Sequence, residues 1–307
     1  MLLSIFIILY SLIFAFFIFK NLNNNNLYDD KRISKILENT IHLDNHACKY
    51  IKKKLEKRTR PFNYENEFIF FSSLISCKIP FSFIRFADCE ENIMRGKDTK
   101  ALDKWHWTPK LKKLRDDLIE SVSICTIPNN FIGLPCKNWI HYSKSILSFS
   151  KCNSAKYMSY STLFVNKNYL LFQNWITRFI YSSNRWKIIL IANSNINKDI
   201  SWAYKFFPVP YNVVEFWDDF SIYMLPILSA QAKKNNLIFF ISAGPVGKII
   251  ISYLSKINNK NIYIDFGSSI EFITKGYSTR SHTKKNNKNS LKGCESFIIK
   301  NKTIIYD

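Results

Sequence analysis

The sequence predicts an α/β fold in which a Rossmann-like, mostly parallel sheet is flanked by helices and preceded by an N-terminal transmembrane helix. Two almost wholly apolar runs, 187–192 and 237–241, are typical of strands buried on both faces of a parallel sheet. Segments of helical character separate these runs from each other and from a further strand at 261–265, as in βαβ units. An uncharged apolar run at 2–19 predicts the transmembrane helix.

The apolar run at 2–19 is long enough to span the hydrocarbon core, since its 18 residues extend about 27 Å as a helix. It starts without Lys or Arg and ends without small residues, so an uncleaved signal-anchor is favoured over a cleaved signal peptide. Lys20, Lys31 and Arg32 follow it, and the positive-inside tendency then predicts a single-pass membrane protein whose main domain faces the cytosol. A luminal orientation stays open.

The chain divides into three parts on this basis. Residues 1–20 are the transmembrane signal-anchor, residues 21–60 a stem with an Asn-rich tract and a basic helical segment, and residues 61–307 the α/β domain.

The elements of the α/β domain follow from local patterns. Residues 80–87 form a strand of β-favouring residues, and Asp88 then caps a short helix that Gly96 ends. Periodic apolar positions and breakers predict the remaining elements in order: helix 110–122, short strand 123–127, helix 169–181, strand 187–192, helix 218–234 broken or kinked at Pro226, strand 237–241, helix 245–256, strand 261–265 and a final apolar stretch 296–306.

Composition and charge bound the function without deciding it. Of the 307 residues 47% are apolar, enough for a sizeable core, which excludes general disorder. Lys and Arg number 44 against 23 acidic residues, and the net charge of +21 favours an anionic partner: nucleic acid, a phosphate-bearing substrate or a membrane surface. The basic residues lie in scattered patches, so charge alone does not choose among these partners.

The seven cysteines are widely spaced and include no C-x-x-C pair, which excludes a zinc ribbon and a thioredoxin-like motif. We expect reduced, mostly buried thiols and no disulfide framework, which favours the cytosol.

Ligands bind beyond the carboxyl ends of strands in an open parallel sheet, and three such ends carry informative residues. Asp88 and Glu90 follow the first strand as a D-x-E pair that can approach a divalent cation together and bridge it to a diphosphate. Helix capping is the alternative explanation of this pair.

The other two strand ends are rich in small or acidic residues. The turn 242–248 brings backbone N–H groups to a helix N-terminus, where they can approach a phosphate, and Lys248 adds charge. A tight turn with Pro at the first helical position explains it equally well. Asp265 stands directly at the end of the third strand, and Glu271 follows six residues later; here a simple Asp-Gly-Ser turn is the alternative.

The three segments together resemble the GT-D-fold glycosyltransferases, nucleotide-sugar enzymes with a D-x-E motif. The family carries a segment like F-S-x-x-R-x-G-D-G-E, then S-x-G-P before a helix, then a strand ending I-D-x-G. The matching residues here are Phe81, Ser82, Arg85, Asp88, Glu90, Ser242, Gly244, Pro245, Lys248, Ile264, Asp265 and Gly267. Ala87 and Cys89 replace the usual glycines, and Ser268 stands where some members have His.

The resemblance implies a hexosyltransferase-like enzyme that moves a sugar from a nucleoside-diphosphate sugar, such as a UDP-sugar, to a glycan or glycoconjugate. Asp88 and Glu90 would hold Mn²⁺ or Mg²⁺. Apart from the resemblance, an inverting enzyme needs a base for the acceptor hydroxyl, and Asp265 and Glu271 are the two candidates for it. The predicted donor-binding residues are Arg85, Asn193, Ser242, Gly244, Pro245, Gly247 and Lys248. Two alternatives stay open: a catalytically inactive membrane-anchored α/β protein, and a basic nucleic-acid-binding protein, for which no recognition motif is present.

Overall fold

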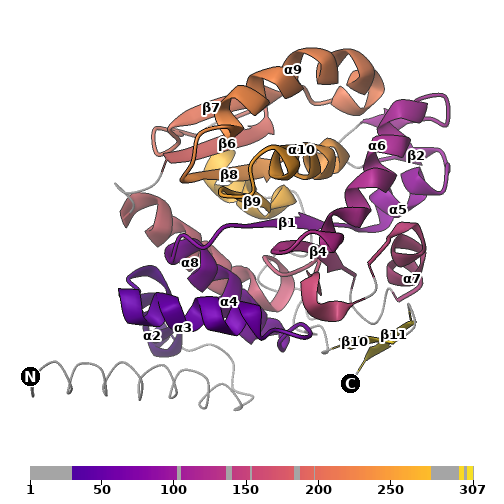
Figure 1. Ribbon diagram of the computed structural model, residues 1–307. Coiled ribbons are helices and arrows are strands. Elements are labelled where there is room, and N and C mark those ends of the chain that lie inside the picture. Colours follow the sequence, from indigo (N-terminus) through magenta and orange to yellow (C-terminus); the bar gives the residue numbers. More distant parts are fainter. Residues whose placement is uncertain are drawn as a thin grey trace, which may run out of the picture.

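A seven-stranded sheet forms the centre of the computed structural model, which describes residues 30–101, 105–135, 140–152, 154–182, 187–196, 198–277, 297–300 and 303–306 (Figure 1). The strand order is β5-β4-β1-β9-β8-β6-β7, and every neighbouring pair is parallel. The strands are β1 (Phe81–Arg85), β4 (Asn130–Leu134), β5 (Met158–Tyr160), β6 (Lys187–Asn193), β7 (Lys205–Val209), β8 (Leu237–Ser242) and β9 (Ile262–Asp265). The predicted α/β fold with a parallel sheet is confirmed.

Helices cover both faces of this sheet (Figure 1). One face packs against α2 (Asp30–Ile41), α3 (Asn45–Glu56), α4 (Tyr64–Ser76) and α8 (Tyr169–Ser182). The other face packs against α6 (Lys112–Val122), α9 (Trp217–Ala232) and α10 (Gly244–Ile257), with α5 (Asp88–Met94) and α7 (Ile140–Phe149) beside α6. Two-stranded pairs lie outside the main sheet: β2 (Thr99–Lys100) with β3 (His106–Trp107), and β10 (Phe297–Lys300) with β11 (Thr303–Tyr306).

The core is dense in aromatic rings on the α4 side of the sheet. Phe71 of α4 contacts Phe81 and Phe83 of β1 and Phe131 of β4 at centroid distances of 4.9–5.3 Å. Edge-to-face and tilted rings of this kind add stability beyond the area that they bury. Because α4 packs on the sheet and on α2 and α3, almost all of its residues are buried.

The predicted stem contributes to the same core. Residues 30–56 form α2 and α3, whose apolar side chains Ile33, Leu37 and Leu55 are each less than 5% exposed. Asp44 separates the two helices and caps α3 by accepting a hydrogen bond from the backbone N–H of Ala47 at 2.7 Å. The described part of the segment 21–60 therefore packs with the α/β domain through α4 and α8.

Several predicted elements differ from the structure. The predicted strand 123–127 is instead a 3₁₀ helix, η2 (Ser123–Thr126). The nearest strand is β4, which begins at Asn130, directly after Asn129 with its positive φ of 62°. Helix α9 runs through Pro226 without a break. No predicted strand corresponds to β5 or β7, and the predicted apolar run 296–306 contains β10 and β11.

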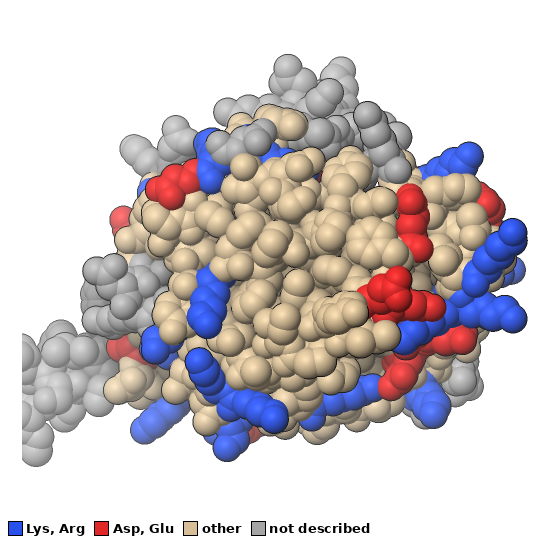
Figure 2. All heavy atoms as spheres, turned by 90° about the horizontal axis from the view of Figure 1, so that it is seen from above, with Lys and Arg blue, Asp and Glu red and all other residues tan. Residues whose placement is uncertain are grey.

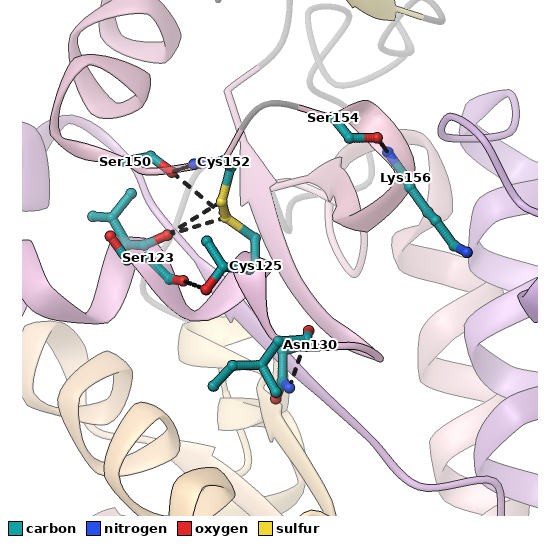
Figure 3. Close-up of a disulfide and its surroundings, with 10 residues drawn as sticks. Ser123, Cys125, Asn130, Ser150, Cys152, Ser154 and Lys156 are labelled. Atoms are coloured by element: carbon teal, nitrogen blue, oxygen red, sulfur yellow. Dashed lines mark hydrogen bonds between the residues drawn. A yellow bond between two sulfur atoms is a disulfide. The ribbon is translucent and has the colours of Figure 1, made fainter.

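The prediction of reduced cysteines is wrong for four of the seven. Cys48 at the start of α3 pairs with Cys77 at the end of α4, with a Cα–Cα distance of 5.2 Å. Cys125 of η2 pairs with Cys152, which follows the end of α7 in the sequence, with a Cα–Cα distance of 5.9 Å (Figure 3). Figure 3 also shows Ser150, whose hydroxyl accepts a hydrogen bond from the backbone N–H of Cys152 at 2.9 Å. Each pair is 27 or 29 residues apart, so only the fold brings its members together.

The face of the molecule over α9 is mainly uncharged. Figure 2 looks down on it and shows Lys, Arg, Asp and Glu mostly toward the margins. Ile222, Tyr223 and Ile227 of α9 are 65%, 74% and 50% exposed there. Within the described parts of the chain, no helix combines the length and the apolar character needed to cross a bilayer. The predicted transmembrane run at 2–19 lies outside the described residues.

Candidate functional site

A cleft of about 820 Å³ opens at the carboxyl ends of the central strands. Residues that follow β1, β6, β7, β8 and β9 line it, as expected for the ligand site of an open parallel sheet. Of the predicted site residues, the cleft brings together Arg85, Asp88, Glu90, Asn193, Ser242, Gly244, Pro245, Lys248 and Glu271. Cavities of this volume accept ligands of the size of a nucleotide or a drug-like molecule.

Lys248 on α10 is the centre of a buried ion network at the floor of the cleft. Its Nζ lies 3.0 Å from Oε1 of Glu90 and 3.0 Å from Oδ2 of Asp265. It also donates a hydrogen bond to the carbonyl oxygen of Gly244 at 3.1 Å. Burial by itself lowers the pKa of Lys248, but the carboxylates of Asp265 and Glu90 outweigh burial, and the pKa is raised above its usual value. Lys248 is therefore a cation at all physiological pH values.

Asp265, at the end of β9, is fully buried and holds neighbouring segments in place. Its Oδ1 accepts a hydrogen bond from the backbone N–H of Gly267 at 3.0 Å, and its Oδ2 accepts from the backbone N–H of Arg85 at 3.3 Å. With Lys248 also bound to Oδ2, both oxygens have partners. Asp265 is not among the residues that line the cleft, which does not favour the predicted role as a base.

Arg85 extends from the end of β1 across the neighbouring strand ends. Its guanidinium donates hydrogen bonds to the carbonyl oxygens of Ser161 at 3.1 Å and Phe266 at 2.7 Å. Its side chain is 13% exposed. Gly267 has a φ of +51°, which favours glycine, and a Cβ there would displace this guanidinium from its present position. Arg85 thus presents a fixed positive charge to the cleft.

The two carboxylates of the D-x-E segment have different surroundings. Glu90 is 6% exposed; its Oε1 contacts Lys248, and its Oε2 accepts a hydrogen bond from the backbone N–H of Ala87 at 3.0 Å. This second contact is a capping-box bond from Glu90 to Ala87, which is the N-cap of α5, so the prediction that Asp88 caps this helix is wrong: Asp88 is its first helical residue. Asp88 is exposed and lines the cleft. Among the residues that the structure describes, no side-chain hydrogen bond or ion pair of Asp88 is present.

The turn between β8 and α10 forms one wall of the cleft. Ser242 donates a hydrogen bond from its hydroxyl to the carbonyl oxygen of Gly267 at 2.8 Å, which ties this turn to the end of β9. Gly244 has a φ of +55°, and Pro245 follows in the first turn of the helix. Gly247 does not line the cleft: a Cβ there would lie 3.1 Å from Cγ2 of Ile241, so its role is close packing of α10 on β8.

Asn193, at the end of β6, and Glu271, at the start of α11 (Glu271–Thr274), also line the cleft. The side-chain oxygen of Asn193 accepts a hydrogen bond from the backbone N–H of Asn195 at 2.9 Å, which is the turn expected for such an Asn. Glu271 is 6% exposed and lies 3.0 Å from Nζ of Lys275.

Sequence reasoning missed a second group of residues that line the cleft. They are aromatic, polar or basic. Lys100 lies in β2, Tyr142 in α7 and Asn166 in the short 3₁₀ helix η5 (Asn166–Asn168), and the others come from loops and turns: Trp105, Ser161, Thr162, Tyr211 and Lys275. Tyr211 follows β7, a strand that contains Pro208 and so gave no clear strand pattern. Aromatic rings beside hydroxyl and amide groups suit a ligand with both flat apolar faces and hydroxyls.

The described residues do not fit the predicted two-carboxylate metal site as they are arranged. They contain no group of three or more His, Cys, Asp or Glu side chains that could hold a metal ion. All four carboxylate oxygens of Glu90 and Asp265 have protein partners. Of the two predicted metal ligands, this leaves the carboxylate of Asp88 as the one that could bind a metal ion. The divalent metal stays a prediction from the sequence.

Comparisons with known proteins give a limited result. No protein-family model and no curated protein matches the sequence. Two similar solved structures share 16% sequence identity with the chain at a TM-score of 0.47. One is a selenomethionine-substituted structure of domain of unknown function 1792, and the match covers 81% of this chain and 94% of that one. The other, with 80% and 92% covered, is described as a highly conserved domain of unknown function 1792 with a distinct glycosyltransferase fold. Similarity at this level assigns no function to the chain.

Proposed function

We propose that the cleft binds a nucleoside-diphosphate sugar and transfers its sugar to a hydroxyl group of a glycan or glycoconjugate. The observation that carries this proposal is the convergence of Arg85, Asp88 and the Ser242–Pro245 turn on one cleft, although they lie up to 160 residues apart. These are the segments on which the resemblance to GT-D glycosyltransferases rests. We further propose that an N-terminal membrane helix keeps the enzyme next to its acceptor.

The cleft offers the means to bind and stabilise a diphosphate. Glycosyl transfer breaks the bond between the anomeric carbon and the diphosphate, so negative charge develops on the leaving group. The N-terminus of α10 presents backbone N–H groups and the positive end of the helix dipole to the cleft. Arg85 and Lys100 add positive charge at the floor and the rim. Preorganised donors of this kind stabilise developing charge.

Asp88 is the residue that we assign to the acceptor side of the reaction. Its carboxylate lies at the cleft, and no cation in the described residues neutralises it. A carboxylate in that state can accept the proton of an attacking hydroxyl group. The proposed reaction uses no metal ion, because the carboxylates of Glu90 and Asp265 already contact Lys248.

The test is donor turnover by purified full-length protein with a panel of UDP- and GDP-sugars, read as release of the nucleoside diphosphate. We expect Asp88→Asn to lower turnover about a hundredfold, the effect typical of losing one catalytic group. Asp116→Asn on α6 is the matched control, since Asp116 is not among the cleft residues. Equal turnover in both variants would contradict the assignment of Asp88, and no turnover of any donor by the parent protein would contradict the function.

A further inference from the structure

The space between Glu90 and Asp265 is filled by the ammonium group of Lys248. Glu90 comes from the helix after β1, Asp265 from the end of β9 and Lys248 from the helix after β8, so three chain segments meet at one cation. Each carboxylate approaches Nζ to 3.0 Å, and the carbonyl oxygen of Gly244 approaches it to 3.1 Å. The three N–H donors of an ammonium group are all used in this way. Lys248 is 5% exposed, so this arrangement is well shielded from water.

The remaining oxygens of the two carboxylates are also engaged. Oε2 of Glu90 accepts from the backbone N–H of Ala87, and Oδ1 of Asp265 accepts from the backbone N–H of Gly267, each at 3.0 Å. Divalent cations bind carboxylate oxygens at about 2.0–2.6 Å, which is closer than any of these contacts. A metal ion could take Glu90 and Asp265 as ligands only after Lys248 had moved away.

Charge balance points to the same conclusion. Lys248 and Arg85 carry two positive charges, and Glu90 and Asp265 carry two negative charges, so this buried group is neutral as it stands. Oδ2 of Asp265 lies 4.0 Å from Nε of Arg85, at the outer limit of an ion pair. Glu90 and Asp265 therefore carry no unbalanced negative charge that would attract a divalent cation while Lys248 is in place.

We propose that Lys248 takes the place of a divalent cation between Glu90 and Asp265, so that the chain binds a nucleoside diphosphate without metal. This inference rests on the proposed function for the identity of the ligand, but its statement about Lys248 stands on the contacts alone. It assigns Lys248, Glu90 and Asp265 as positioning residues that hold the ends of β1, β8 and β9 together below the cleft.

The first test is titration of the full-length protein with MnCl₂ alone, followed by calorimetry and by electron paramagnetic resonance of free Mn²⁺. We expect no binding by the parent protein tighter than about 1 mM, the range of weak metal sites. Lys248→Met removes the ammonium group and leaves two carboxylates facing each other, so we expect it to bind Mn²⁺ at least tenfold more tightly. Lys256→Met is the matched control: Lys256 lies on the same helix and contacts the carboxylate of Glu120 at 2.5 Å, but it is exposed, so this variant should behave as the parent does.

The second test is UDP binding by the parent protein with EDTA and with MnCl₂, which does not depend on whether Lys248→Met folds. Equal affinity for UDP in both conditions is expected. Micromolar binding of Mn²⁺ by the parent protein, or a tenfold loss of UDP affinity in EDTA, would overturn the inference. Failure to bind UDP in either condition would contradict the proposed function instead, and the Mn²⁺ titration would then decide the role of Lys248 by itself.

Discussion

Asp88 and Glu90 are two residues apart in one motif, yet the fold gives them different tasks. Glu90 is buried against Lys248 and Ala87, whereas Asp88 lies at the surface of the cleft. The sequence predicts that both residues reach the cleft, because both follow a strand end. It does not predict the ion pair with Lys248, because that pair depends on how two helices 150 residues apart lie over the sheet.

The two carboxylates should therefore respond differently to neutralisation. Glu90→Gln removes one charge of a buried pair and should lower the free energy of unfolding by about 3 kcal/mol. Asp88→Asn affects only an exposed residue at the N-terminus of α5, so we expect a loss of at most about 1 kcal/mol. Denaturant unfolding of both variants measures the difference. Equal stability of the two variants would show that the contact between Glu90 and Lys248 contributes little.

Lys54 on α3 gives a pH-dependent test of the packing around α4. Burial lowers the pKa of Lys54 to about 8, while Glu67 acts in the opposite direction. Its Nζ lies 4.2 Å from the centroid of the Phe62 ring. The unfolded chain, in which the pKa is about 10.4, binds more protons than the folded chain between pH 8 and pH 10. Stability should therefore rise with pH through this window.

Comparison with Lys54→Met isolates this contribution from other groups that titrate above pH 8. From pH 7.5 to pH 10 the melting temperature of the parent protein should rise relative to that of the variant, because the parent no longer keeps a charge in a partly buried site. A constant difference over that range would contradict the lowered pKa of Lys54.

At the scale of elements, the sequence predicts the strands that are buried and apolar throughout. β6, β8 and β9 lie where their apolar runs predict them, within one or two residues. The short strands β4, β5 and β7 were not predicted: β4 contains Gly133, β5 has three residues and β7 contains Pro208. Their strand conformation comes from pairing with neighbours in the sheet and not from local preference.

The two disulfides are a second feature that only the packing of elements determines. Both link segments next to helix ends, Cys48 to Cys77 and Cys125 to Cys152. We expect alkylation of the unreduced, unfolded protein to leave these four cysteines unmodified and to modify Cys89. Changing Cys125 and Cys152 together to Ser should lower the free energy of unfolding by about 2–4 kcal/mol. Modification of all seven cysteines without reductant would contradict both pairs.

At the scale of the whole molecule, the disulfides change the expectation for compartment. Disulfides persist in oxidising compartments, so the pairs favour a lumen or the cell exterior over the cytosol that the sequence predicts. Asn301-Lys-Thr303 is an acceptor pattern for N-glycosylation. In a eukaryotic expression host we expect a glycosidase-sensitive increase in mass that Asn301→Gln abolishes. A protein of unmodified mass with all thiols reduced would favour the cytosolic orientation.

The apolar run at 2–19 should keep the full-length protein in membranes. We expect it to stay in the membrane fraction through high-salt and carbonate washes, because a span of this length buries its side chains in the bilayer. A shortened chain that begins at Asp30 should leave that fraction. Release of the full-length protein by carbonate would contradict the predicted anchor.

The central claim is that the cleft at the strand ends is the site of a nucleoside-diphosphate sugar, and calorimetric titration with UDP-sugars and GDP-sugars tests it most directly. Asn193 lines the cleft and Asn195, two residues further on, does not, so Asn193→Trp and Asn195→Trp form a matched pair. We predict that the parent protein and Asn195→Trp bind the same donor with similar affinity, and that Asn193→Trp loses at least tenfold in affinity while remaining folded. Equal binding by all three proteins, or binding of no donor by the parent, would contradict the account.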